Sequence, residues 1–135
     1  MIKALSLLQP WASLVVMGAK RIETRSWSTD CRGILMIHAS KGKSGAGIAQ
    51  MPMLNKYIPD FNALPFGAII GEVNLTAVVR IEELSLSTEL VNKLSMEEYA
   101  FGDYAAGRYA WLFDDAFAYD EPIPAKGSLG LWEAG

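Results

Sequence analysis

Residues 5–27 read LSLLQPWASLVVMGAKRIETRSW, and this run predicts a strand end, a short helix and a second strand in succession. The first strand is expected over residues 2–8. The helix is expected from Pro10 to Met17, because proline suits the first helical position and apolar residues then repeat at helical spacing. Gly18 ends the helix, since glycine readily takes the left-handed conformation just past a helix end.

An acid, a guanidinium and an indole follow that helix at alternate positions. In a strand over residues 21–27, side chains alternate with period two, so Glu23, Arg25 and Trp27 are expected on one face. Lys20 precedes the strand, where the negative end of the helix dipole favours a cation. Two interpretations stay open: an ion pair on a solvent-facing surface, or the rim of a ligand pocket.

The rest of the chain is typical of a mostly β protein. Residues 33–39 form an apolar run, and residues 67–82 alternate long enough to predict a bent strand kinked near Gly71. Strands over residues 108–113 and 127–133 are expected near the end. Strands with few short helices, and no regular strand–helix alternation, predict an α+β, mostly β fold: a small β-barrel with helices attached.

Short helices are expected in the connections. One lies between residues 48 and 57 and is broken or capped by Pro52. Two more are expected near Ser87 and Ser95, the second with a capping box. At 135 residues the chain is predicted to form one domain, spanning residues 1–135.

Composition excludes several classes of protein. No stretch approaches the roughly 20 apolar residues of a membrane span. Cys31 is alone, so an internal disulfide is impossible and a cytoplasmic location is expected. With one cysteine and one histidine, His38, a Cys/His metal site is excluded, whereas a site of carboxylates alone stays open. His38 is expected to be a core histidine, and no cofactor is expected.

Charge divides unevenly along the chain. Residues 1–56 carry eight Lys/Arg and two acids, a net charge of +6, and residues 57–135 carry four Lys/Arg and thirteen acids, a net charge of −9. A basic region can mark an anionic ligand such as nucleic acid. Equally, the two halves can interleave in space and the asymmetry can vanish.

Other residues have the chemistry of a nucleic-acid site. Ser40 and Lys41 follow a predicted strand where it opens into a loop, a common place for ligand contacts. Trp11, like Trp27, can stack on an unpaired base beside cations. Arg108 and Lys126 are candidates for phosphate contact.

Taken together, the run quoted above and the later RGILMIHASK resemble the activating-signal-cointegrator homology (ASCH) domain. The family's short helix ends in G-x-K-x-x-E-x-R, matched here by Gly18, Lys20, Glu23 and Arg25. The tail, GRYAWLF followed by EPIPAKGSLGLWE, is similar to the end of small bacterial and phage members. The resemblance implies a PUA-like pseudo-barrel, and RNA binding or RNA-linked chemistry in a cleft bounded by that motif.

One branch of the family hydrolyses N4-acetylcytidine, and some members are described as ribonucleases. Lys20 matches the lysine of the amidohydrolase branch, whereas Glu23 stands where that branch has its threonine nucleophile. A carboxylate general base that activates water would be a different mechanism. Glu97, Glu98 or Asp103 fall near the position of the branch's later glutamate.

Three hypotheses follow. The first is RNA or nucleotide binding. The second is a hydrolase of the same fold, amidohydrolase or ribonuclease, with Lys20 and Glu23 as its catalytic pair. The third is a regulatory protein-interaction module. The residues expected to bind the ligand are Trp11, Lys20, Glu23, Arg25, Trp27, Ser40, Lys41 and Arg108.

Overall fold

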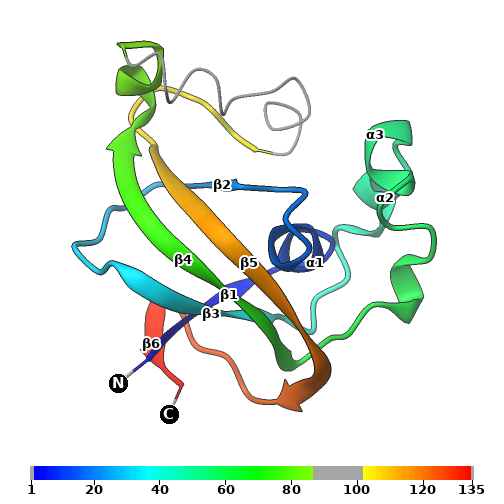
Figure 1. Ribbon diagram of the computed structural model, residues 1–135. Coiled ribbons are helices and arrows are strands. Elements are labelled where there is room, and N and C mark those ends of the chain that lie inside the picture. The colour runs from blue at the N-terminus through cyan, green and yellow to red at the C-terminus, as the bar shows by residue number, and fades with distance from the viewer. Residues whose placement is uncertain (1, 87–101, 135) are drawn as a thin grey trace.

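Six strands form one curled sheet in the computed structural model, which describes residues 2–86 and 102–134 (Figure 1). The strand order is β2-β5-β4-β3-β1-β6, and every described pairing is antiparallel except β1 with β3. Because β2 and β6 end the order unpaired with each other, the sheet is a half-barrel. The prediction of a mostly β, PUA-like fold is confirmed. The strands are β1 (Lys3–Leu7), β2 (Ile22–Arg25), β3 (Gly33–Ala39), β4 (Ala68–Arg80), β5 (Tyr109–Pro124) and β6 (Leu131–Glu133).

Short helices occupy the connections. Helix α1 (Trp11–Val16) joins β1 to β2, and α2 (Ala46–Ala49) and α3 (Pro52–Asn55) lie between β3 and β4. Pro52 begins α3, so the predicted break at this proline is confirmed. Single 3-10 segments cover Phe61–Ala63 and Ile81–Leu86. The helices expected near Ser87 and Ser95 fall outside the described residues.

Helix α1 is held at its start and stopped at its end by local interactions. The buried Gln9 side chain accepts a hydrogen bond from the Ser13 amide at 2.9 Å and donates one to the Pro65 carbonyl at 2.8 Å. Gly18 has a φ of 81°, which confirms that it ends the helix. The helix packs its apolar residues against the concave sheet, in a core that includes Leu5, Val15, Ile37, Val73 and Trp111.

Several strand boundaries differ from the sequence prediction. Strand β5 runs for 16 residues instead of ending at Phe113, and β6 begins only at Leu131. Residues 114–124 are rich in acids and prolines, which are unfavourable in strands, so the sequence pattern does not indicate one. In the structure they pair with β4 across several β-bulges. Strand β2 ends at Arg25, two residues before Trp27.

The predicted kink near Gly71 is confirmed by a register shift between Ile69 and Gly71. A Cβ at Gly71 would lie 2.4 Å from the Phe117 carbonyl oxygen and 2.7 Å from Val16. Glycine is therefore required where β5 and α1 both approach the bent part of β4.

Candidate functional site

The lysine of the G-x-K-x-x-E-x-R motif lies inside the protein. Lys20 is 1% exposed, and its amide donates to the Leu14 carbonyl at 3.0 Å, which fixes it just after α1. Its Nζ donates to the Ile22 carbonyl and lies 3.5 Å from Glu23 Oε1. The expectation that Lys20 lies on a pocket rim is wrong. The Lys20 side chain is almost completely buried and lies behind Glu23.

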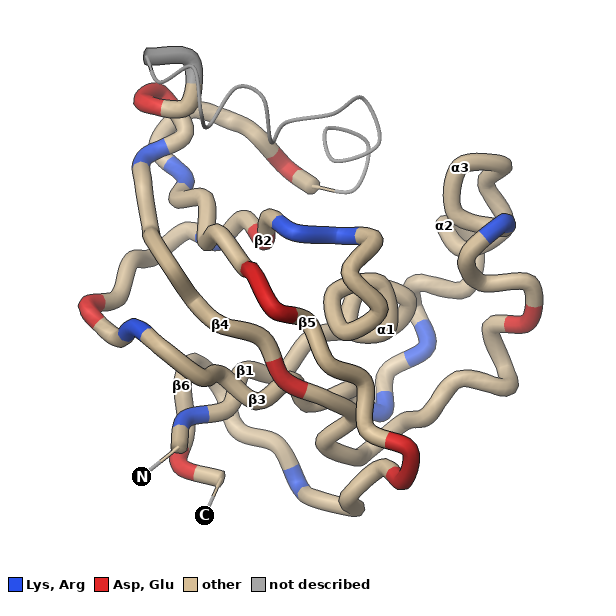
Figure 2. The backbone as a smooth tube through the Cα atoms, viewed as in Figure 1, with Lys and Arg blue, Asp and Glu red and all other residues tan. Residues whose placement is uncertain are grey.

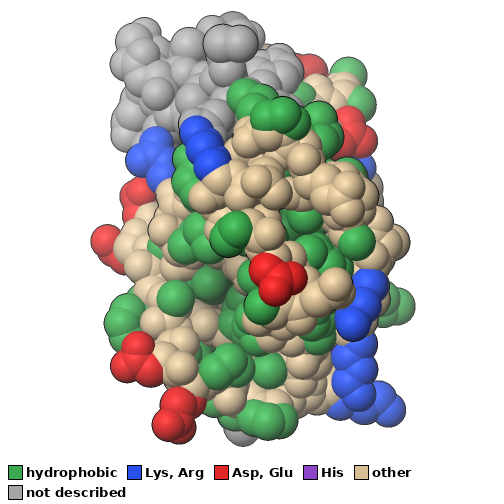
Figure 3. All heavy atoms as spheres, turned by 90° about the vertical axis from the view of Figure 1, so that its right-hand side faces the viewer, with side chains coloured by type: hydrophobic (Ala, Val, Ile, Leu, Met, Phe, Trp, Pro, Cys, Tyr) green, Lys and Arg blue, Asp and Glu red, His purple; other side chains and the backbone are tan. Residues whose placement is uncertain are grey.

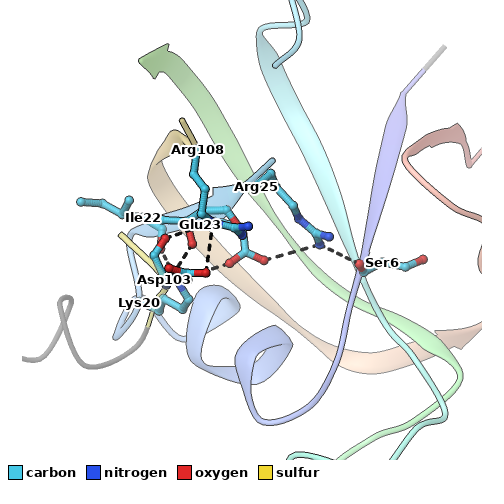
Figure 4. Close-up of polar contacts among 8 residues, drawn as sticks. Ser6, Lys20, Ile22, Glu23, Arg25, Asp103 and Arg108 are labelled. Carbon is cyan, nitrogen blue, oxygen red and sulfur yellow. Dashed lines mark hydrogen bonds and ion pairs between the residues drawn. The ribbon is translucent and has the colours of Figure 1, made fainter. Parts of the chain in front are cut away.

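Glu23 lies between two cations. Its second carboxylate oxygen is 3.5 Å from Arg25 Nη2, and that same nitrogen donates to the Ser6 carbonyl at 3.0 Å (Figure 4). The side chains are 12% exposed for Glu23 and 27% for Arg25, so both reach the surface from β2. The Arg25 Nε–H is buried and has no hydrogen-bond partner in the part of the chain that the structure describes. The guanidinium thus keeps unused donor capacity.

Arg108 is held against β2 and Asp103. Its Nη2 donates to the Thr24 carbonyl at 3.1 Å, and its Nε donates to the Asp103 carbonyl at 3.2 Å. An ion pair with the Asp103 carboxylate at 3.6 Å adds to these bonds. Of the three acids considered for a third catalytic position, Asp103 is described and pairs with Arg108, whereas Glu97 and Glu98 lie outside the described residues.

A hollow of about 290 Å³ brings together six of the eight predicted binding residues. We call it the aromatic hollow, because two indoles line it. Trp27 is half-buried, and its ring packs edge-to-face on Trp111 with centroids 4.8 Å apart. The lining residues that the sequence predicted are Trp11, Glu23, Arg25, Trp27, Ser40 and Arg108.

A larger cleft of about 1020 Å³ adjoins the aromatic hollow. We call it the cationic cleft: among its lining residues the ionised side chains are Arg25, Lys41 and Lys126, with no acid. Ser6, Arg25 and Ser40 line both spaces, so the two lie side by side. Figure 3 shows Lys and Arg side chains along the lower right edge of the face that carries α2 and α3, and others near its upper left.

The absence of a side chain at Gly67 leaves room for the Lys41 side chain. Gly67 has a φ of 67°, and a Cβ there would lie 2.9 Å from Lys41 Cε. The aliphatic stem of Lys41 therefore packs directly on the Gly67 backbone, at the mouth of the cationic cleft. A side chain at position 67 would be strained and would displace this lysine.

Of the residues that line the cationic cleft, sequence reasoning named Lys126 but missed Ser6 and the rest of the loop of residues 125–130. Ser6 lies beside His38 because β1 and β3 pair in parallel with these residues in register. A local pattern carries no sign of that pairing, since the strands are joined by a crossover of more than twenty residues. His38 is 3% exposed, as expected for a core histidine.

The charge asymmetry along the chain persists in part in space. Asp114, Asp115, Asp120 and Glu121 lie on β5 and line neither the cationic cleft nor the aromatic hollow (Figure 2). Within residues 2–86 and 102–134, no group of three or more His, Cys, Asp or Glu side chains is placed to hold a metal ion. No helix in the same ranges has the length and apolar character needed to cross a membrane.

Comparison with known proteins identifies relatives of both the sequence and the fold. The family model described as the ASCH domain matches residues 5–121. Activating signal cointegrator 1 from Mus musculus and from Homo sapiens are each 40% identical to the chain in an alignment of 77 positions, which covers 53% of this chain and 13% of the relative. The chain thus corresponds to a small part of these relatives.

Crystal structures of the ASCH protein from Zymomonas mobilis share the fold. The protein itself superposes with a TM-score of 0.52 at 20% identity, covering 90% of this chain and 72% of that one. A mutant of it gives a TM-score of 0.53 at 21% identity, covering 90% and 74%. Similarity at this level of identity shows the fold alone.

Proposed function

The chain belongs to the ASCH domain family, and from that premise we propose that it binds single-stranded RNA across the cationic cleft and the aromatic hollow. The observation that carries the proposal is that the two spaces share Ser6, Arg25 and Ser40 in their linings. A nucleotide has an anionic backbone and an aromatic base, and the two adjoining spaces offer a cationic lining and an aromatic one.

The cationic cleft suits the phosphate backbone. Affinity for nucleic acid comes largely from cations that neutralise phosphates and release counterions. Arg25, Lys41 and Lys126 supply three positive charges from three separate segments, and no carboxylate among the lining residues opposes them. Arg25 adds a planar fork that matches a phosphate geometrically.

The aromatic hollow suits an unpaired base. Proteins that bind single strands stack bases on aromatic side chains, each stack contributing about 1–3 kcal/mol. Trp11 and Trp27 supply such faces, and the Glu23 carboxylate can accept hydrogen bonds from a base edge. Lys20 and Arg25 fix that carboxylate from two sides, which orders the acceptor before the ligand arrives.

Replacing Lys41 or Lys126 by glutamine is expected to weaken RNA binding by several-fold and to flatten its salt dependence. Each phosphate contact on a single strand contributes a slope of roughly 0.7 in the logarithm of affinity against the logarithm of salt. The slope of each variant should therefore be smaller in magnitude than the wild-type slope by about 0.7. Fluorescence anisotropy of a labelled single-stranded oligonucleotide, titrated at several salt concentrations, measures both quantities.

Arg80→Gln is the matched control for charge. Arg80 is exposed on β4 and lines neither the cationic cleft nor the aromatic hollow. Its replacement changes the net charge by the same amount, and the slope should stay at the wild-type value. A slope that falls equally in all three variants would show diffuse attraction instead of binding in the cleft.

A second candidate function, hydrolysis with Glu23 as general base, is favoured by the setting of that carboxylate. Glu23 also lines a hollow of about 400 Å³ with Trp11, Met51 and Asp103, so a substrate can approach it from two sides. Lys20 is buried and would orient Glu23 without touching substrate.

The hydrolase is tested with N4-acetylcytidine. A hydrolase should release acetate, and Glu23→Gln should abolish release because glutamine cannot accept the proton from water. Acetate measured by proton NMR gives the rate. The wild-type protein releasing none would reject this activity and leave the binding proposal intact.

A further inference from the structure

A chain of hydrogen bonds joins β6, β1, β3 and the loop of residues 125–130. Trp132 Nε1 donates to Ser6 Oγ at 3.1 Å, and Ser6 Oγ lies 3.0 Å from His38 Nδ1. His38 Nε2 lies 2.8 Å from the Ala125 carbonyl oxygen. Ser6, His38 and Ala125 line the cationic cleft, whereas Trp132 does not.

The donor and acceptor of each of these hydrogen bonds follow from the groups at the two ends of the network, the Ala125 carbonyl and the Trp132 indole. A carbonyl oxygen only accepts, so His38 Nε2 carries the proton and donates to Ala125. In the neutral ring, Nδ1 is then an acceptor, and the Ser6 hydroxyl donates to it. The Ser6 oxygen in turn accepts from the indole of Trp132, which only donates. The network is complete with neutral His38 in its Nε2–H tautomer.

A serine beside a histidine whose far nitrogen is oriented by a third group has the layout of an activated nucleophile. The loop argues against that role here. A Cβ on Gly127 would lie 2.6 Å from both Ser6 Oγ and His38 Cε1, so the Gly127 backbone covers the pair directly. The hydroxyl is also engaged twice, as donor to His38 and as acceptor from Trp132, which leaves little room for an electrophile. The pair therefore anchors the loop.

We propose that His38 is a positioning residue: its Nε2–H bond to Ala125 holds the 125–130 loop so that Lys126 faces the cationic cleft. The proposal rests on the proposed RNA binding for its functional consequence. Ala125 is fixed a second time by its own amide, which donates to the Gly67 carbonyl at 3.1 Å. If the His38 bond were lost, the bond from the Ala125 amide to Gly67 would remain, and the loop could rotate about that single attachment.

Two variants separate the bonds of His38. In His38→Gln the amide nitrogen stands near the position of Nε2 and keeps the donor to Ala125. In His38→Asn the amide oxygen stands near Nδ1 and keeps the acceptor for Ser6 but loses the donor to the loop. We expect Gln to preserve the loop and Asn to release it, although both replace the ring by a smaller side chain.

The first measurement uses the protein without RNA. Nitrogen-15 NMR should show His38 protonated at Nε2, and hydrogen exchange of amides 126–128 should accelerate at least about tenfold in His38→Asn but much less in His38→Gln. A local opening of this kind is distinct from global unfolding. A ring protonated at Nδ1, or equal exchange of the loop in wild type and both variants, would overturn the proposal.

The second measurement is a double-mutant cycle on RNA affinity. If His38 acts through Lys126, His38→Asn with Lys126→Gln should bind no more weakly than Lys126→Gln alone. Fully additive losses would overturn the positioning role. Wild-type protein that fails to bind RNA while the loop responds as expected would reject the proposed function and leave the anchor standing.

Discussion

Replacing Arg25 by glutamine is expected to weaken single-stranded RNA binding about 10- to 100-fold, because a hydrogen bond to a charged group contributes roughly 1.5–3 kcal/mol. Arg25 lines both the cationic cleft and the aromatic hollow, so its loss affects the phosphate and base sides together. It also removes the cation beside Glu23 and the bond to the Ser6 carbonyl. Fluorescence anisotropy at fixed salt measures the change in affinity.

Arg25→Lys refines that prediction. It keeps the positive charge but loses the planar guanidinium, whose Nη2 contacts both Ser6 and Glu23, so its affinity should lie between wild type and Arg25→Gln. The thermal midpoint of each variant shows whether the fold is kept. Affinity within twofold of wild type for folded Arg25→Gln would contradict the proposed path of the RNA.

Replacing Lys20 by methionine is expected to lower the free energy of unfolding by about 1–3 kcal/mol, since it leaves the Ile22 carbonyl without this donor and removes one of the two cations beside Glu23. Lys20 is 1% exposed and binds both the Ile22 carbonyl and Glu23, so methionine would fill the space and satisfy neither. Urea unfolding followed by circular dichroism gives the free energy.

The double variant Lys20→Met with Glu23→Gln isolates the pair. Removing both charges should be less destabilising than the sum of the two single changes, with a coupling of roughly 1 kcal/mol or more. Additive effects would show that Lys20 acts through the Ile22 carbonyl alone. An unfolding free energy unchanged in Lys20→Met would contradict the structural role of this lysine.

Local rules in the sequence predicted much of the fold. The end of the first helix at Gly18, the break at Pro52 and the kink at Gly71 depend on the conformational preferences of single residues, and each is confirmed. Their physical cause acts within a few residues of chain, which is why they can be predicted without knowledge of the tertiary structure. Pro10 was expected at the first helical position and instead caps a helix that begins at Trp11.

Features that depend on strand pairing were not predictable in this way. Strand β5 was expected to end at Phe113, because acids and prolines are tolerated in a strand only where bulges and an exposed face accommodate them. Ser6 meets His38 through a parallel pairing, and Gly127 closes over both from the far end of the chain. Each contact joins residues more than thirty positions apart.

In the candidate site, too, local features were predicted from the sequence and features that depend on tertiary packing were not. Period-two alternation placed Glu23 and Arg25 together, and the structure has them 3.5 Å apart beside Trp11 and Trp27. The alternation of side chains along a strand does not show which side chains are buried by other elements. Lys20 was therefore expected on the rim of the pocket, whereas its side chain is buried. Burial is set by packing between elements, which a one-dimensional pattern does not contain.

The path of the RNA is tested most directly by nitrogen-15 NMR during titration with a single-stranded oligonucleotide. Binding across the adjoining spaces predicts shifts at the indole resonances of Trp11 and Trp27 and at the backbone amides of Ser40, Lys41 and Lys126. The amides of Asp120 and Glu121 on β5 should stay in place, since these residues line neither space. Shifts confined to β5, or no shifts at saturating RNA, would contradict the account.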